Sequence, residues 1–196
     1  MAWEFDWLLA IQQIRSGFLD IFMRILSTLG DGGIFWILCG IVLFAYPRTR
    51  KVGITVILSM SLSFILGNLI LKTIINRSRP YEVMTELIPL VRKPHDSSFP
   101  SGHTLNSFTS SVAILCHNRK WGIPAVILAF GIGFSRMYNL VHFPTDVLAG
   151  MILGTIVAIT VYFFLKKRAE KKENENGWFN YFKNMMYFGY NNQSPH

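Results

Sequence analysis

Charged residues are scarce in this sequence. They make up 15% of its 196 residues, whereas hydrophobic residues make up 51%. Soluble domains usually carry about a quarter charged residues, so the composition excludes an ordinary soluble domain. Several apolar runs approach the roughly 20 residues with which a helix crosses a bilayer. The sequence therefore predicts an all-α, polytopic membrane helix bundle.

Three other features are absent, and each absence narrows the class of protein. The two cysteines, Cys39 and Cys116, lie in or at the end of apolar runs, which is typical of small buried hydrophobes and not of a disulfide framework. No cleavable signal peptide is expected, because Gln12 and Arg15 interrupt the first apolar run. No Cys/His cluster has zinc-ligand spacing and no carboxylates crowd together, so we expect no metal and no cofactor.

The apolar runs divide the chain into spans and flanking segments. Residues 4–29 are amphipathic, which fits a helix at the membrane interface or, less well, a sixth span that faces the bundle. Five further runs predict clear spans: 34–46, 52–71, 103–116, 122–138 and 147–165. We expect an N-terminal amphipathic segment at 1–30, a membrane core at 31–166, and a basic, aromatic tail at 167–196. In the tail, residues 177–190 predict an aromatic helix on the cytoplasmic leaflet, with a partly disordered end as the alternative, and we expect disorder in the last few residues.

The net charge of +8 is concentrated in three short basic loops, at 47–51, 117–120 and 166–172. Positive charge in short loops beside membrane spans is explained by binding to anionic lipid and by the orientation of the protein in the membrane, so we expect no nucleic-acid partner. By the positive-inside rule these loops and the C-terminus are cytoplasmic. Three polar segments, at 72–80, 99–103 and 135–146, then meet on the extracytoplasmic face and form a candidate site.

The segment 135–146 joins two apolar runs but carries Arg136, His142 and Asp146. Ionisable groups beside a bilayer are costly unless they are paired or used. Pro144 favours a helix start, and the Asp146 carboxylate in its first turn can hold His142 so that the other ring nitrogen is free to attack. Arg136 supplies a forked donor suited to phosphate. The segment predicts a phosphate-handling histidine site, with an ordinary polar loop as the alternative.

Two basic residues mark the start of the long polar connection at 73–100: Lys72 precedes it, and Arg79 lies within it. Lys72 and Arg79 are seven positions apart, so on a continuing helix they would share a face. A lysine that reaches toward solvent from a span end is the alternative for Lys72. Arg77 points at a different angle, and we expect it to be solvated or lipid-facing.

The third segment opens a span with Ser101, Gly102 and His103. Ser101 is suited to cap the helix, whose free amides and dipole favour a phosphate in front of them. Gly102 allows a ligand to approach the backbone, and His103 could act as a general acid. A simple helix cap beside an interfacial histidine is the alternative.

Together these segments resemble the three-part signature of the type 2 phosphatidic acid phosphatase superfamily. The matching residues are Lys72, Arg79 and Pro80, then Pro100, Ser101, Gly102 and His103, and finally Ser135, Arg136, His142 and Asp146. The resemblance covers roughly residues 30–165 and implies a six-helix membrane arrangement with metal-independent lipid phosphatase activity. It implies that His142 is the nucleophile, oriented by Asp146, and that His103 protonates the leaving oxygen. The phosphate would be held by Lys72, Arg79, Ser101, Gly102 and Arg136.

The resemblance narrows the substrate to a lipid phosphate. Undecaprenyl diphosphate is preferred, with phosphatidylglycerophosphate, phosphatidate and lipid A phosphates as alternatives, in a bacterial plasma membrane. A non-catalytic lipid-phosphate binder or transporter is the alternative of another class, although transporters usually place charges at the bilayer midplane. A vanadate-dependent peroxidase has a similar signature but a soluble setting. Membrane lipids are the other expected partners, and the oligomeric state stays open.

Overall fold

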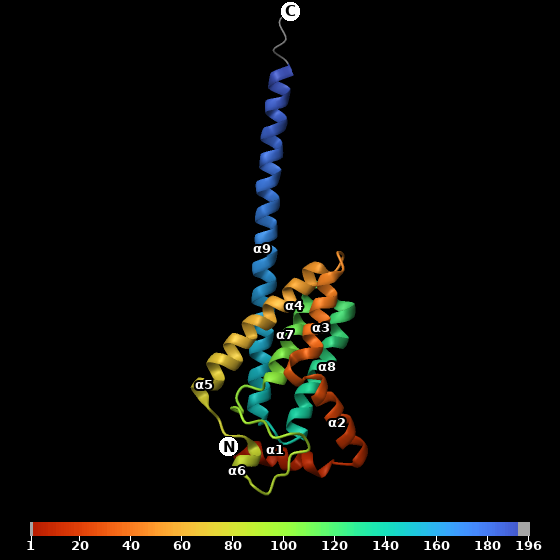
Figure 1. The fold of residues 1–196 in the computed structure, drawn as a ribbon, viewed down its shortest axis with the longest axis vertical. Coiled ribbons are helices and arrows are strands. Elements are labelled where there is room, and N and C mark those ends of the chain that lie inside the picture. Colours follow the sequence, from red (N-terminus) through yellow and green to blue (C-terminus); the bar gives the residue numbers. More distant parts are fainter. Residues whose placement is uncertain (1, 192–196) are drawn as a thin grey trace, which may run out of the picture. The chain divides into compact units, whose positions relative to one another are not determined.

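The computed structural model describes the backbone of residues 2–191 and the side chains of residues 2–177. Every regular element in this part of the chain is a helix, which confirms the predicted all-α class (Figure 1). The chain forms two compact units, residues 1–161 and 162–196, which are described separately. In chain order the helical elements are α1 (Ala2–Gln13), α2 (Gly17–Leu29), the 3-10 turn η1 (Asp31–Gly33), α3 (Ile34–Ala45), α4 (Arg50–Ser63), the π-helical η2 (Phe64–Leu71), α5 (Lys72–Ile75), α6 (Pro80–Val83), α7 (Gly102–His117), α8 (Arg119–Tyr138) and α9 (Pro144–Asn191).

The N-terminal segment contains two helices where the sequence predicted one amphipathic helix over 4–29. α1 ends at Gln13, and α2 begins after Ser16, whose Oγ accepts a hydrogen bond from the Leu19 N–H at 3.3 Å. A serine in this position satisfies an amide at a helix start, so one helix stops and a second begins here. α2 and residues 31–45 then meet at an angle of 41°.

Among the described residues, three stretches long and apolar enough to cross a membrane lie within 50–83, 119–138 and 144–177. The bent pair of α2 and residues 31–45 makes a fourth if it acts as one span. α7 is shorter, with 16 residues, and many of its buried side chains are serines and threonines. The chain is an integral membrane helix bundle, while five clear spans with a possible sixth stay a prediction.

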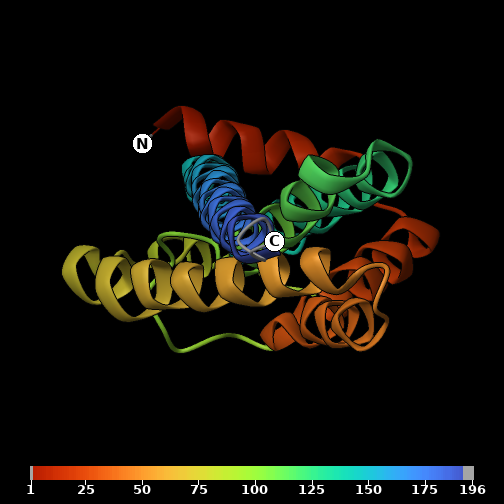
Figure 2. The ribbon, with the colours of Figure 1, turned by 90° about the horizontal axis from the view of Figure 1, so that it is seen from above.

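α7 is the central helix of the first unit, where it packs along α8 and α4 (α7 in Figure 1). Figure 2 shows the same helices from above. The beginning of α9 also lies against α7, at two glycines. A Cβ atom on Gly150 would lie 2.8 Å from the Ser101 carbonyl oxygen, and one on Gly154 would lie 2.7 Å from that of Leu105. Small residues four positions apart allow helices in membranes to approach closely. The start of α9, with Asp146, is thereby placed beside the start of α7.

The two ends of the first unit carry different segments. The connections that follow α3 and α7 lie at one end, whereas α1, α6 and the long loop at 84–101 lie at the other (Figure 1). The predicted convergence of the polar segments at one end is therefore present in the fold. The side of the membrane that this end faces stays a prediction.

In the second unit α9 continues as a helix to Asn191. Lys171 and Glu175, one turn apart and exposed, pair at 3.8 Å. The predicted aromatic helix on the cytoplasmic leaflet has a helical backbone over 177–190, but its side chains beyond 177 lie outside the described residues.

Candidate active site

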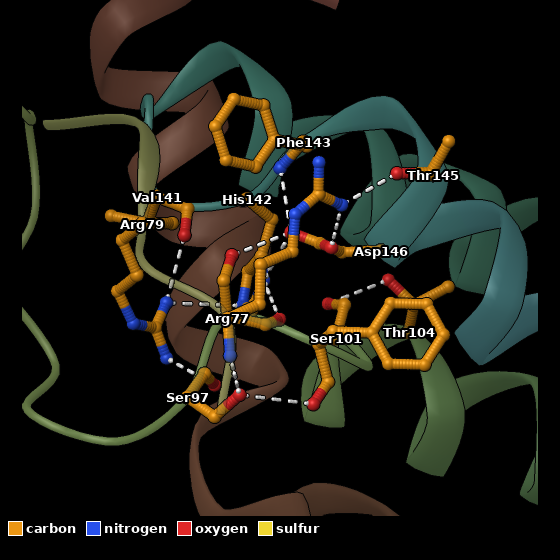
Figure 3. Close-up of polar contacts among 12 residues, drawn as sticks. Arg77, Arg79, Ser97, Ser101, Thr104, Val141, His142, Phe143, Thr145 and Asp146 are labelled. Atoms are coloured by element: carbon orange, nitrogen blue, oxygen red, sulfur yellow. Dashed lines mark hydrogen bonds and ion pairs between the residues drawn. The ribbon is translucent and has the colours of Figure 1, made fainter. Parts of the chain in front are cut away.

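His142 lies in the short connection between α8 and α9, and only 2% of it is exposed. Its Nδ1 atom lies 2.8 Å from the carbonyl oxygen of Ser98. Because a carbonyl oxygen can only accept, Nδ1 carries the hydrogen and Nε2 keeps its lone pair. Nε2 lies 3.3 Å from a terminal nitrogen of Arg79 (Figure 3). The imidazole is thus oriented with its unprotonated nitrogen beside a cation.

Asp146 lies near His142 as predicted, but the contact differs from the predicted one. The distance from its Oδ2 atom to Nδ1 of His142 is 3.6 Å, which is longer than a hydrogen bond. Instead, Oδ2 accepts hydrogen bonds from the Phe143 N–H at 2.8 Å and from the Ser98 hydroxyl. The carboxylate therefore fixes both backbone segments that hold the histidine, and it acts on the ring through its charge. Nothing in the sequence singled out Ser98.

The surroundings of His142 favour its neutral form. Burial lowers the pKa of this histidine most, and the positive charges of Arg79 and Arg136 lower it further. The nearby Asp146 carboxylate acts in the opposite direction, and the resulting pKa is about 3, against an ordinary value of 6.5. At neutral pH the imidazole is therefore uncharged, which is the state that a nucleophile requires.

Lys72 and Arg79 come together, although the predicted reason was wrong. The helix does not continue between them: α5 ends at Ile75, and Asn76 has a left-handed backbone with φ 41°. Both residues instead bind the carboxylate of Asp96 in the loop before α7. The contact from a terminal nitrogen of Arg79 to Oδ1 of Asp96 is 2.7 Å long. Two predicted phosphate-binding cations thus share one anion supplied by the chain itself.

Asp96 is held as a carboxylate. Its partial burial opposes ionisation, but hydrogen bonds and charges from Lys72 and Arg79 outweigh this effect and lower its pKa to about 2. Its side chain is 53% exposed, so it can leave the site without opening the core. An acidic oxygen held between these cations marks a place where a phosphate oxygen would bind.

Ser101 and Gly102 lie at the start of α7, as predicted, but Ser101 does not cap the helix with its side chain. It is fully buried, and its hydroxyl accepts a hydrogen bond from the Thr104 hydroxyl at 3.0 Å (Figure 3). A Cβ atom on Gly102 would lie 3.3 Å from Asn68 Oδ1 and 3.9 Å from Lys72 Nζ. The glycine therefore leaves room beside the lysine ammonium group.

His103 pairs with a residue that the sequence did not identify. Its Nε2 atom lies 2.8 Å from Oδ1 of Asp31. Asp31 belongs to the glycine turn between α2 and α3, where Gly32 and Gly33 have φ values of 59° and 69°. The turn fits closely around the ring, since a Cβ atom on Gly30 would lie 2.6 Å from the His103 side chain. Only the unusual density of glycine in this turn could have drawn attention to it.

Arg136 is buried in the last turn of α8, with 3% of it exposed. One terminal nitrogen donates to the Ser27 hydroxyl of α2, while its Nε atom is buried and has no hydrogen-bond partner among the described residues. A buried guanidinium nitrogen without a partner is costly, so this group is available for an anion.

A cavity of about 640 Å³ joins these groups. It brings together six of the eight predicted residues, and Ser101 and Asp146 lie behind its lining. Additional basic residues of α2 and the loop at 84–101 line the same space. The ionisable residues of the lining are Arg24, Asp31, Lys72, Arg79, Arg92, Lys93, His95, Asp96, His103, Arg136 and His142.

Arg77 contradicts its predicted placement. It is neither solvated nor lipid-facing, because its guanidinium group lies between the carboxylates of Glu4 and Asp146. These contacts could not be predicted from spacing, since Glu4 is 73 positions away in the chain.

The fold and the cavity define a class of protein: a membrane helix bundle with a cationic, histidine-bearing site at one end. The family is shown by sequence. The model of the PAP2 superfamily matches residues 52–170, and the chain belongs to this superfamily. The resemblance drawn from the three motifs is therefore confirmed.

Individual relatives agree with this assignment. The chain is 37% identical over 124 residues to a protein named undecaprenyl-diphosphatase from Sulfolobus acidocaldarius; the match covers 63% of this chain and 60% of the relative. The crystal structure of a PAP2 type phosphatidylglycerolphosphate phosphatase from Bacillus subtilis is similar at TM-score 0.71 and 30% identity, over 85% of this chain and 86% of that one. The structure of Aquifex aeolicus LpxE has TM-score 0.72 and 30% identity, over 80% and 93% of the two chains.

Proposed function

We propose that this chain is a lipid phosphate phosphatase that works through a phosphohistidine intermediate. The observation that supports this proposal most directly is the state of His142: its Nδ1–H is held by the Ser98 carbonyl, and its free Nε2 lies beside Arg79 in a cationic cavity. A neutral imidazole in this position is suited to attack phosphorus, while fixed cations stabilise the charge on the transferred group.

In the first step the substrate phosphate displaces the Asp96 carboxylate and binds Lys72 and Arg79. Arg136, the start of α7 at Ser101 and the open space at Gly102 complete its surroundings. Nε2 of His142 then forms a bond to phosphorus as the bond from phosphorus to the leaving oxygen breaks. His103, which is held by Asp31 and takes up a proton as the anionic phosphate binds, gives this proton to the leaving oxygen.

In the second step water attacks the phosphohistidine. Neutral His103 takes a proton from the water, and the bond from phosphorus to Nε2 breaks. Inorganic phosphate leaves, and both histidines return to their starting states. With a lipid diphosphate the other product is the lipid monophosphate, and with a lipid monophosphate it is the lipid alcohol.

We propose undecaprenyl diphosphate as the substrate, with phosphatidylglycerophosphate, phosphatidate and lipid A phosphates as alternatives. Arg24, Arg92 and Lys93 line the cavity in addition to the signature cations, which suits the larger negative charge of a diphosphate. The name of the Sulfolobus relative agrees with this choice. The exposed apolar helix faces would leave the lipid tail in the bilayer while the head group enters the cavity.

The basic loops support an orientation with the cavity on the extracytoplasmic face of a plasma membrane and the C-terminus in the cytoplasm. In this proposal residues 31–166 form the phosphatase core. Residues 1–30 provide the N-terminal helices, and residues 167–196 form the cytoplasmic tail.

The test is phosphate release by detergent-purified protein in the presence of EDTA, with the four lipid classes as substrates. We expect release from at least one of them, and its loss in His142→Ala and His103→Ala variants that keep the thermal-unfolding midpoint of the wild type. Full activity in either variant would refute the mechanism. Lipid binding without release from any substrate would favour a lipid-phosphate binder.

A further inference from the structure

Arg77 lies behind the cavity and pairs with two carboxylates. One terminal nitrogen donates to Oδ1 of Asp146 at 2.6 Å, and the other donates to Oε2 of Glu4 at 2.7 Å (Arg77 and Asp146 in Figure 3). The side chain is 16% exposed, whereas those of Asp146 and Glu4 are 0% and 4% exposed. One guanidinium group therefore serves two nearly buried carboxylates.

Two further contacts fix this arrangement. The Thr145 hydroxyl accepts a hydrogen bond from Arg77 at 2.6 Å and donates one to Glu4 (Thr145 in Figure 3). The guanidinium carbon lies 4.2 Å from the centre of the Phe143 ring. Arg77 thus contacts residues on both sides of Pro144, at the point where the connection that carries His142 becomes α9.

The charges explain why this arrangement matters for His142. Asp146 lies 3.6 Å from Nδ1 of His142, and a lone buried carboxylate at this distance would favour the imidazolium form. Pairing with Arg77 compensates the Asp146 charge, and the bonds from Arg77 fix the position of its Oδ1 atom. Neither Arg77 nor Glu4 lines the cavity, so both act on the reaction through Asp146.

We propose that Arg77, braced by Glu4 of α1, is a positioning residue that holds Asp146 in place and keeps His142 in its nucleophilic form. Glu4 precedes the family match at residues 52–170, so this assignment makes the N-terminal helix part of the catalytic apparatus. The inference rests on the proposed function, in which His142 is the nucleophile.

The consequence is a pH dependence whose direction can be worked out. The charged groups that face His142 are Asp146 from α9, Arg79 from the start of α6 and Arg136 from α8, with Arg77 and Glu4 acting through Asp146. Removing the Arg77 charge leaves Asp146 uncompensated, which raises the pKa of His142. As the pH falls, the variant then loses the active, neutral form of His142 at a higher pH than the wild type does.

We expect Arg77→Gln to lower kcat by about 10- to 100-fold, with KM within about twofold because the cavity lining is unchanged. The acid limb of its kcat–pH profile should move to higher pH by about one unit. Arg77→Lys should restore the acid limb but not the full kcat, because an ammonium group keeps the charge and loses the fork. In Glu4→Gln, Asp146 is the one carboxylate that still pairs with Arg77, so its charge stays compensated. The acid limb of this variant should therefore stay in place or move to lower pH.

Arg15→Gln is the matched control, since Arg15 is also paired with a carboxylate, Asp20 at 3.1 Å, in the N-terminal segment and away from the cavity. It should leave kcat and the pH profile unchanged. A wild-type acid limb in Arg77→Gln, or the same shift in Glu4→Gln and Arg77→Gln, would overturn the inference.

A second measurement separates this inference from the proposed function. The titration of His142 is followed by NMR in protein labelled at the histidine ring carbon, with the signal assigned by its loss in His142→Gln. A higher pKa of His142 in Arg77→Gln than in Arg15→Gln supports the inference even if no lipid in the panel is hydrolysed. Equal pKa values overturn it, even if phosphate release proves the proposed function right.

Discussion

At the scale of single residues, Asp96 places a carboxylate where the proposed reaction needs a phosphate. Its pKa of about 2, against an ordinary value of 3.8, means that Asp96 is ionised throughout the neutral range and competes with phosphate there. The same shift stabilises the fold above about pH 4, and this contribution is lost as the pH falls through 2. The competition should therefore persist at every pH well above 2.

Asp96→Asn should lower the inhibition constant of inorganic phosphate by about three- to tenfold, because Lys72 and Arg79 no longer hold a competing charge. The measurement is inhibition of phosphate release from a lipid substrate by added phosphate. Glu86→Gln is the control, because it removes one negative charge from the same exposed loop but does not line the cavity. Equal inhibition constants in the two variants would show that Asp96 does not occupy the phosphate position.

The predicted site residues were found from residue type and spacing, because histidines, lysines and arginines beside apolar runs are costly and stand out. Their partners were not found. Ser98, Asp31 and Glu4 are ordinary residues in sequence, and they gain their roles from contacts with residues that are 44 to 73 positions away. Arg77 was misplaced for the same reason: its angle on an assumed helix said nothing about carboxylates elsewhere in the chain.

At the scale of elements, the close contact between α9 and α7 positions Asp146, and it depends on glycine. Gly150→Ala would place a Cβ atom 2.8 Å from the backbone oxygen of Ser101, directly before α7, and this atom cannot move aside freely. We expect a loss of about 1–3 kcal/mol of stability together with reduced activity. The thermal-unfolding midpoint in detergent and the rate of phosphate release measure these two effects.

Gly177→Ala on the same helix is the control, because a Cβ atom there would meet nothing within 4 Å. Alanine also has the higher helix propensity, so this variant should be neutral or more stable by about 0.5–1 kcal/mol. If Gly150→Ala had the same midpoint as Gly177→Ala, the helices would not depend on this close approach.

The sequence predicted well which segments are helical, and less well where each helix begins and ends. The break at Ser16 carries a recognisable cap signal, yet the amphipathic spacing on both sides suggested one helix over 4–29. The break at Asn76 was missed because the sequence does not show that this residue adopts the left-handed conformation. In sequence it is one more polar residue near the end of a span. Tertiary bonds at Asp96 then bring Lys72 and Arg79 together by a route that helical spacing does not describe.

At the scale of the first unit, topology brings the signature together. The polar segments reach the same end because an even number of passes separates them, and the close contact of α7 with α8 and α9 reduces the remaining distance. This part of the prediction needed only span counting and the distribution of basic loops. The role of α1 needed the structure, because its polar link to the site is the buried carboxylate of Glu4, which binds Arg77.

The orientation of the bundle can be tested with cysteines at its two ends. Lys93 lies beside the cavity, Lys51 follows the basic connection at the other end, and both are exposed. Lys93→Cys and Lys51→Cys are made in a background in which the native cysteines, Cys39 and Cys116, are replaced by serine. In spheroplasts of a bacterial host, a membrane-impermeant thiol reagent should label Lys93→Cys directly, and Lys51→Cys only after permeabilisation. The reverse pattern would place the cavity on the cytoplasmic face of the membrane. A lipid-phosphate substrate would then have to enter it from the inner leaflet.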